Sequence, residues 1–245
     1  APLVVTNDRA GPMARLFAFE YAGLFRGLLP WLARRELLVP LGGTSNHIRR
    51  DALDVVGGWD PYNVTEDADL GARLTREGYR VATITRPTFE DGPETLRVWL
   101  PQRTRWFKGW MQSWLVHMRH PVRLLRELGA GSFLVLQILF LGMVASALAH
   151  PIFLATLFWT GIKLATTGGV QGYHATLMGI DLFNVVAGYI AFLLIGLRTL
   201  SQRESAGFGK VLVFTPVYWV LLSFAAWRAV WQLIRRPHHW EKTPH

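Results

Sequence analysis

VTEDADLGARLTREGYRVATITRPTFEDGPETLRVWLPQRTRW, residues 64–106, is the stretch that decides how this chain is organised. It opens on the carboxylates Glu66, Asp67 and Asp69 and closes on two arginines beside an indole. The residues before it have the pattern of a soluble α/β half-domain, and the residues after it have that of a membrane protein. Two such clusters facing one site would suit a reaction that needs a base and releases a negative leaving group.

Composition indicates a soluble part followed by a polytopic membrane part. Of the 245 residues, 51% are hydrophobic and 11 are Trp, the mean hydropathy is +0.21, and the apolar residues gather after Gly131. The chain has no Cys, which excludes disulfides, thiolate metal sites and a cysteine nucleophile. Residue 1 is Ala, and we expect the chain to be the C-terminal part of a longer protein.

The net charge of +9 has two explanations, nucleic-acid binding and membrane anchoring. Membrane anchoring is favoured because basic residues flank the apolar spans, namely Arg119, Arg123, Arg126, Arg228, Arg235 and Arg236. We therefore expect a lipid bilayer and no nucleic acid among the partners.

The N-terminal part alternates helix and strand patterns. Helical periodicity covers residues 12–35 and 50–56, with a stop at Pro30, and short strands are predicted at 38–41 and 79–84. Between them lies the loop GGTSNH, 42–47, whose paired glycines let a backbone approach a ligand closely. A plain turn would have the same residues.

Thr65 is predicted as the N-cap of a helix that ends at Gly78. Glu66, Asp67 and Asp69 then fall in the first turn, where the helix dipole stabilises negative charge. That stabilisation alone explains the acidic cluster, so its chemistry depends on a partner.

Residues 96–117 form a second kind of helix, with an aromatic stripe at three- and four-residue steps. An amphipathic, basic, Trp-rich helix ahead of a membrane span fits a helix lying in the membrane interface. Spans are predicted at 131–149, 177–197 and 211–227. Residues 152–165, after a turn at His150-Pro151, either return across the bilayer or dip into it.

The two motifs complement each other chemically. A carboxylate at Asp67 near a hydroxyl serves as a general base. Arginines in QRTRW, 102–106, bind diphosphate oxygens bidentately, and an indole offers a flat platform for a sugar ring. A base, a diphosphate clamp and an aromatic platform describe glycosyl transfer from a nucleotide sugar.

GGTSNH, GGWDPYNVTEDADL and QRTRWFKGW together resemble the membrane-embedded family 2 glycosyltransferases, in their bacterial cellulose-synthase-like branch. The resemblance implies an inverting enzyme that transfers sugar from a UDP-sugar donor to a growing polysaccharide, with a glycan acceptor. It implies a bacterial inner membrane location with the catalytic part cytoplasmic. Two alternatives stay open: transfer of a single sugar to a lipid-linked acceptor, and a non-catalytic membrane module.

The resemblance also implies roles for individual residues. Asp67 is the base, with Glu66 and Thr65 shaping the site, and the donor diphosphate is bound by Gln102, Arg103 and Arg105. The acceptor is bordered by Trp106 and by the loop residues Gly43, Thr44, Ser45, Asn46 and His47. The tail is similar to a gating segment, with Trp240, Lys242 and Thr243 as its gating residues.

One family feature is missing from the sequence. The divalent cation of the family, Mg or Mn, is bound by a D-x-D motif that precedes the acceptor loop, and none with strand context occurs before Gly42. We therefore expect this chain to hold no metal ligands and to lack the nucleotide-binding half.

The sequence thus predicts an α/β fold, part of a GT-A-like domain, followed by an amphipathic interfacial helix and a transmembrane bundle of about four spans. The expected units are the acceptor-side part of the catalytic domain at 1–95, interfacial helices at 96–128, transmembrane helices at 129–233 and a cytoplasmic tail at 234–245.

Overall fold

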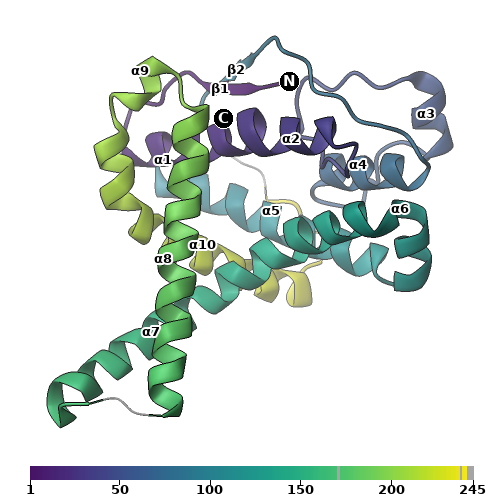
Figure 1. The fold of residues 1–245 in the computed structure, drawn as a ribbon. Coiled ribbons are helices and arrows are strands. Elements are labelled where there is room, and N and C mark those ends of the chain that lie inside the picture. The colour runs from purple at the N-terminus through teal and green to yellow at the C-terminus, as the bar shows by residue number, and fades with distance from the viewer. Residues whose placement is uncertain (170–171, 238, 242–245) are drawn as a thin grey trace.

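The computed structural model describes residues 1–169, 172–237 and 239–241. Helices dominate it, and Figure 1 shows them as a body from which α7 and α8 extend together. In chain order the elements are β1 (Leu3–Val5), α1 (Pro12–Tyr21), η1 (Ala22–Leu28), α2 (Leu29–Arg34), α3 (Arg50–Val55), α4 (Glu66–Arg76), β2 (Thr88–Glu90), α5 (Leu96–His117), α6 (Pro121–Leu136), η2 (Gln137–Gly142), α7 (Met143–Thr167), α8 (Tyr173–Thr199), α9 (Gln202–Ser205) and α10 (Phe208–Arg235).

The expected α/β sheet is reduced to two short parallel strands. β1 pairs with β2 in the register Leu3↔Thr88 to Val5↔Glu90. The strands predicted at 38–41 and 79–84 are not formed. A strand needs a neighbour to receive its backbone hydrogen bonds. Within the described residues, the segment 38–41 has no backbone ladder, and the Leu38 amide donates instead to Ser132 Oγ, 3.0 Å away.

The first predicted helix is confirmed over 12–34, but its stop is not. Proline Pro30 lies in the first turn of α2, directly after the π-helical segment η1, and the helix continues to Arg34. Proline lacks an amide donor, and the first turn of a helix is the place where that donor has no intrahelical partner. The backbone hydrogen-bond pattern therefore changes just before Pro30, but the chain stays helical.

The helices that carry the two motifs are confirmed. α4 begins directly after Thr65 and is followed by Gly78 with φ +80°, a left-handed conformation that glycine adopts without strain. α5 spans Leu96–His117, with Pro101 in its interior. The position of α5 relative to a bilayer stays a prediction, because no membrane is present.

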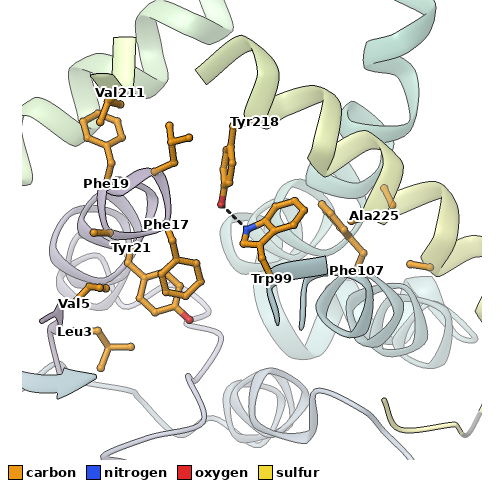
Figure 2. Close-up of a cluster of buried hydrophobic side chains, with 14 of the residues drawn as sticks. Leu3, Val5, Phe17, Phe19, Tyr21, Trp99, Phe107, Val211, Tyr218 and Ala225 are labelled. Atoms are coloured by element: carbon orange, nitrogen blue, oxygen red, sulfur yellow. Dashed lines mark hydrogen bonds between the residues drawn. The ribbon is translucent and has the colours of Figure 1, made fainter. Parts of the chain in front are cut away.

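Two apolar cores hold these helices together. One joins α1, α5, α7 and α10, and Figure 2 shows Trp99 of α5 donating to the hydroxyl of Tyr218 on α10, 3.1 Å away, among Phe17, Phe19 and Tyr21. The second joins α2, α4, α6 and η2. α5 thus lies between the α4 motif and the apolar helices.

Within the described residues, three helical segments are long and apolar enough to cross a membrane, against about four expected spans. They are Pro121–Thr167, Tyr173–Thr199 and Phe208–Arg235. The turn predicted at His150-Pro151 is wrong, because α7 continues through Pro151 to Thr167. Membrane helices tolerate an interior proline where neighbouring groups satisfy the freed carbonyl. α6 does contain a break, at Gly129 with φ +71°.

The C-terminal half of α10 runs beside α5 in the same direction. Trp99 contacts Tyr218, and further along both helices Thr104 Oγ1 accepts from Arg228, 2.9 Å away. Beyond the end of α10, Gln112 Nε2 donates to the carbonyl of Pro237 at 2.9 Å. The start of α10 lies at α1, where the Phe19 and Phe208 rings are 5.9 Å apart. Both ends of α10 therefore lie against the N-terminal half.

Candidate functional site

The turn before α4 is fixed to α5 by small and polar residues. Asn63 Oδ1 accepts from the Thr65 amide at 3.0 Å, and Asn63 Nδ2 donates to Ser113 Oγ at 2.8 Å. Thr65 packs on Gly109, where an added Cβ would lie 2.2 Å from Thr65 Oγ1. Thr65 occupies the N-cap position without capping α4 through its side chain. Its place is structural: it sets the N-terminus of α4 against α5.

Asp67 lies half-buried in the first turn of α4. The pKa of Asp67 is raised from 3.8 to about 6, chiefly by burial and also by the charge of exposed Glu66, while the Ala68 amide and Arg105 act in the opposite direction. Asp67 Oδ1 accepts from the Ala68 amide at 2.7 Å. A carboxylate with this pKa is mostly ionised at pH 7 and still basic enough to accept a proton.

The glycine loop reaches Asp67 through its backbone. An added Cβ at Gly43 would lie 3.2 Å from Asp67 Oδ2, so glycine lets the loop approach the carboxylate closely. The side chains of Thr44, Ser45, Asn46 and His47 line a separate hollow of about 220 Å³ beside residues 79–84. Ser45 Oγ is 2.6 Å from Thr88 Oγ1 of β2, which ties the loop to the sheet.

Arg105 is the arginine that faces the acidic cluster. Burial lowers its pKa, while the negative charges of Glu66 and Asp67 raise it. On its other side the guanidinium lies 5.8 Å from the Trp240 ring centroid and 3.5 Å from the Glu241 carbonyl. The tail therefore meets α5 at Arg105, next to the predicted base.

The tail is anchored at this point. The Glu241 carboxylate accepts two bonds from Arg228, at 2.8 and 2.6 Å, and one from Gln232 at 3.0 Å. The predicted gating residues Lys242 and Thr243 lie outside the described residues. Of the predicted gating residues, Trp240 is described and lies beside Arg105.

Arg103 is placed differently from the diphosphate clamp that QRTRW suggests. Its guanidinium is buried and bound bidentately by Glu20 of α1, at 2.8 and 2.6 Å, and it donates to Tyr218 at 3.1 Å. Residues two apart on a helix project to nearly opposite sides, so Arg103 and Arg105 serve different surfaces. Burial lowers the pKa of Arg103 and the Glu20 charge outweighs this, so the guanidinium stays charged.

Gln102 and Trp106 flank the two arginines. Gln102 Oε1 is buried and has no hydrogen-bond partner within the described residues, which leaves an acceptor for a ligand. Trp106 stacks on Tyr21, with ring centroids 5.9 Å apart, and lies 4.5 Å from the Arg103 guanidinium. The indole thus belongs to the aromatic core at its border with a cavity.

That cavity, called here the apolar chamber, has a volume of about 870 Å³. It lies where α7 and α8 join α1, η1, α5 and α10, and its lining includes Leu24, Phe107, Met143, Phe153, Phe192 and Leu222. Trp106, Tyr21, Glu20 and Arg103 also line it.

A buried charge network holds α4, α5 and α6 together behind Asp67. Asp69 accepts from His117 Nε2 at 3.0 Å and from Arg73 at 2.7 Å, and Arg76 joins His117 to Glu127. Burial raises the pKa of Asp69, and the bonds from His117 and Arg73 outweigh it, leaving the pKa lowered. Asp69 is therefore an ionised residue that links α4 to α5. Asp67, two residues away, has a raised pKa instead.

The chain does not present a cation site of its own in this region. The family generally uses a divalent cation. Among residues 1–169, 172–237 and 239–241, no three His, Asp or Glu side chains are placed so that they could hold a metal ion together.

The sequence reasoning missed Glu20 and Tyr218, which hold Arg103. Glu20 stands alone as an acid among apolar residues in FAFEYAG, 17–23, and such an isolated charge signals a buried partner. Tyr218 lies in an apolar helix, where nothing in the local pattern distinguishes it. Neither residue's partner can be read from spacing, because 83 and 115 positions separate them from Arg103.

Comparison with known proteins gives consistent matches. The probable glycosyltransferase YdaM of Bacillus subtilis (strain 168) is 38% identical over 73 residues, 29% of this chain and 17% of that protein. A beta-monoglucosyldiacylglycerol synthase of Synechocystis sp. is 35% identical over 104 residues, 40% of this chain and 22% of that protein. The cellulose synthase catalytic subunit of Komagataeibacter sucrofermentans is 31% identical over 118 residues, 46% of this chain and 15% of that protein.

The chain thus spans less than a quarter of the length of each of these relatives. No solved structure gives a significant match. The model of the family described as glycosyl transferase family group 2 matches residues 2–163, which include the glycine loop, Asp67, Arg105 and the first part of the membrane region. With its three long apolar helices, the chain is a membrane protein and belongs to glycosyl transferase family group 2.

Proposed function

We propose that this chain supplies the acceptor side of an inverting glycosyl transfer from a UDP-sugar. Asp67 takes the proton of an acceptor hydroxyl, whose oxygen forms a bond to the anomeric carbon of the donor. The bond from that carbon to the diphosphate oxygen breaks on the opposite face, and UDP leaves with the electron pair. One displacement inverts the anomeric configuration.

The observation that carries this proposal is the setting of Asp67. Its pKa of about 6, its place against the Gly43 backbone and the nearby Arg105 put a basic carboxylate beside a cationic group. The N-terminal location on α4 alone would stabilise a carboxylate at a low pKa. A raised pKa at that location is a feature expected of a proton acceptor.

Arg105 and Gln102 are the proposed contacts to the donor diphosphate from this chain. Arg105 faces the acidic cluster, and the side-chain amide of Gln102 would donate from Nε2 to a phosphate oxygen, while its buried Oε1, unpartnered in the described part of the chain, would accept from another group of the donor. Arg103 is omitted from the clamp, because Glu20 and Tyr218 already occupy its guanidinium. Trp240 beside Arg105 supports a tail segment that covers the donor.

Two classes of molecule are candidates for the acceptor, a growing polysaccharide and a lipid. Cellulose synthases among the relatives support a growing polysaccharide made processively. Glucosyldiacylglycerol synthases among them support transfer of one sugar to a lipid. A non-catalytic module is disfavoured, because it has no need for a basic Asp67 facing Arg105. Bacterial relatives and the cytoplasmic supply of UDP-sugars support an inner-membrane enzyme with its catalytic part in the cytoplasm.

The test is the substitution Asp67→Asn in the full-length enzyme. Loss of a general base lowers turnover by about 10²–10⁴-fold. UDP release and sugar incorporation are measured with radiolabelled UDP-sugar, and donor binding is measured by calorimetry. We expect turnover to fall and donor binding to survive.

Glu77→Gln is the matched control, because Glu77 is an exposed carboxylate at the other end of the same helix. It is expected to leave turnover near that of the wild type. Near-normal turnover of the Asp67→Asn enzyme would exclude Asp67 as the base. Absence of any UDP release from the wild-type enzyme would support the non-catalytic module instead.

A further inference from the structure

The apolar chamber has more room and less polarity than a site for a sugar needs. Its volume of about 870 Å³ falls in the range of roughly 300–1,000 Å³ that ligand pockets occupy. Apart from Tyr and Trp side chains, the polar residues that line it are Glu20, Arg103, Ser146, His150 and Asn184. Hydroxyl groups buried without hydrogen-bond partners cost free energy, so a glycan with several hydroxyls per ring fits this lining poorly.

The two charges in the chamber are already neutralised. Glu20 and Arg103 bind each other bidentately, and Tyr218 donates to Glu20 at 2.6 Å. This ion pair leaves no free cation for an anionic headgroup. Apart from Ser146, His150 and Asn184, the remaining wall is aliphatic and aromatic, which favours a hydrocarbon chain taken out of water.

The chamber is connected to the predicted base by a series of aromatic rings. Trp106 on its wall stacks on Tyr21 at 5.9 Å, and Tyr21 lies 5.0 Å from Phe25. The Phe25 ring contacts Gly42, where an added Cβ would lie 2.8 Å from it. The next residue, Gly43, lies against Asp67. The chamber wall and the glycine loop thus lie at two ends of one aromatic cluster, and a molecule would have to extend out of the chamber along this cluster to reach Asp67.

The chemistry of Asp67 selects the reacting group of such a molecule. A hydroxyl needs a base to lose its proton, whereas a phosphate is already ionised at neutral pH. A neutral lipid with a hydroxyl headgroup fits both the chamber and the base.

We propose that the apolar chamber binds the acyl chain of a neutral lipid acceptor, such as a diacylglycerol, and presents its hydroxyl group to Asp67. This inference rests on the proposed function and names its acceptor class. The chamber lies at the root of the α7–α8 extension, so an acyl chain enters it from the bilayer and the headgroup stays at the body of the protein (Figure 1).

The test fills the chamber without disturbing the fold. Gly188 of α8 lines the chamber, and an added Cβ there meets only Trp219 at 3.6 Å, which is ordinary contact. Gly188→Leu places a branched side chain in the space. Gly179→Leu is the matched control on the same helix, because an added Cβ at Gly179 has nothing within 4 Å.

The probe is a diacylglycerol with a photoactivatable diazirine in one acyl chain, incorporated with the full-length enzyme into nanodiscs. We expect crosslinks to peptides of α7 and α8 in the wild type and in Gly179→Leu, and about tenfold less labelling in Gly188→Leu. The rate of glucosyl transfer to diacylglycerol should fall in parallel, while hydrolysis of UDP-sugar is retained. Equal labelling of the two leucine variants would overturn the proposal.

Two further arms separate the alternatives. A polyprenyl phosphate with the same diazirine should label the chamber weakly, and labelling stronger than that by diacylglycerol would overturn the neutral-lipid assignment. Asp67→Asn should keep the labelling and lose transfer. If it kept both, the base assignment would fail while the chamber assignment stood, so the two failures are distinguishable.

Discussion

At the scale of single residues, the site depends on two carboxylates of one helix turn that have opposite surroundings. Asp69 is buried against His117 and Arg73, which lower its pKa, whereas burial raises the pKa of Asp67 to about 6. The same helix N-terminus serves both. His117 of α5 and Arg73 of α4 keep Asp69 ionised, whereas burial without such partners raises the pKa of Asp67, the proposed base.

Ionised Asp67 should lower the free energy of unfolding at neutral pH. A carboxyl whose pKa is raised on folding holds its proton more tightly in the folded chain, so stability falls as pH rises from about 4 to about 6. Asp67→Asn should therefore raise the free energy of unfolding at pH 7 by about 1–3 kcal/mol, since one pKa unit corresponds to about 1.4 kcal/mol.

The measurement is thermal unfolding of the full-length protein in detergent at pH 7 and pH 4. The gain should be present at pH 7 and nearly absent at pH 4, where Asp67 is protonated in the folded state. Glu77→Gln, with its exposed side chain, should show no such gain. An Asp67→Asn protein less stable than the wild type at pH 7 would contradict the assigned burial.

The sequence points to Asp67 and the QRTRW residues but does not show which of these residues contact one another. Helical spacing shows that Arg103 and Arg105 cannot face one surface. Only the fold shows which of them meets Asp67, because Glu20 and Tyr218 reach Arg103 from distant parts of the chain. The glycine loop is similar: Gly43 leaves room beside Asp67, while the side chains of residues 44–47 line a separate hollow.

At the scale of elements, the contact between α4 and α5 sets the site. Thr65 on one side and Gly109 on the other bring the two helices together, and Arg105 lies one turn before Gly109. Gly109→Ala adds a Cβ 2.2 Å from Thr65 Oγ1. Overpacking of this kind costs about 1–3 kcal/mol.

The control for Gly109→Ala is Gly161→Ala in α7, where an added Cβ has nothing within 4 Å. Glycine to alanine in an open helix position is favourable by about 0.5–1 kcal/mol. The two substitutions should therefore change the melting temperature in opposite directions. A stabilised Gly109→Ala protein would show that α4 and α5 do not meet at this point.

Elements with local signals are predicted well from the sequence, and elements that need a distant partner are not. α5 was predicted over its full range, because its aromatic stripe repeats at helical steps. The strands at 38–41 and 79–84 carry strand patterns but have no ladder within the described residues. Strand identity depends on a neighbour that the local sequence does not contain.

At the scale of the whole molecule, packing distinguishes the three long apolar helices. α7 and α8 extend from the body and expose apolar side chains such as Phe158, Phe183 and Ile190 along their length (Figure 1). A hydrocarbon environment accounts for such surfaces. α10 instead runs beside α5 and returns the tail to Arg105.

About four spans were expected because the dipeptide His150-Pro151 is typical of a turn, whereas α7 continues through it. Residues 131–167 continue as helix for roughly 55 Å, at about 1.5 Å per residue, which exceeds the hydrocarbon thickness of ~30 Å. Hydropathy and proline position do not reveal such an overlong helix. The packing of its root against α1, α5 and α10 creates the apolar chamber, which no local pattern predicts.

In the proposed function, the base lies at the junction between a soluble half-site and a membrane chamber. α4 supplies Asp67, α5 supplies Arg105 and Trp106, and the membrane helices supply the apolar wall. Such a junction suits an enzyme that joins a water-soluble donor to a bilayer-resident acceptor. Its central claim is that ionised Asp67 accepts the acceptor proton.

The pH dependence of kcat/KM for the full-length enzyme tests this claim most directly, since it reports the pKa of the essential base in the free enzyme. The account predicts that kcat/KM rises with pH below about 6, as Asp67 loses its proton, and is level from about pH 7. A profile that is flat between pH 5 and pH 7, or that falls over this range, would contradict it.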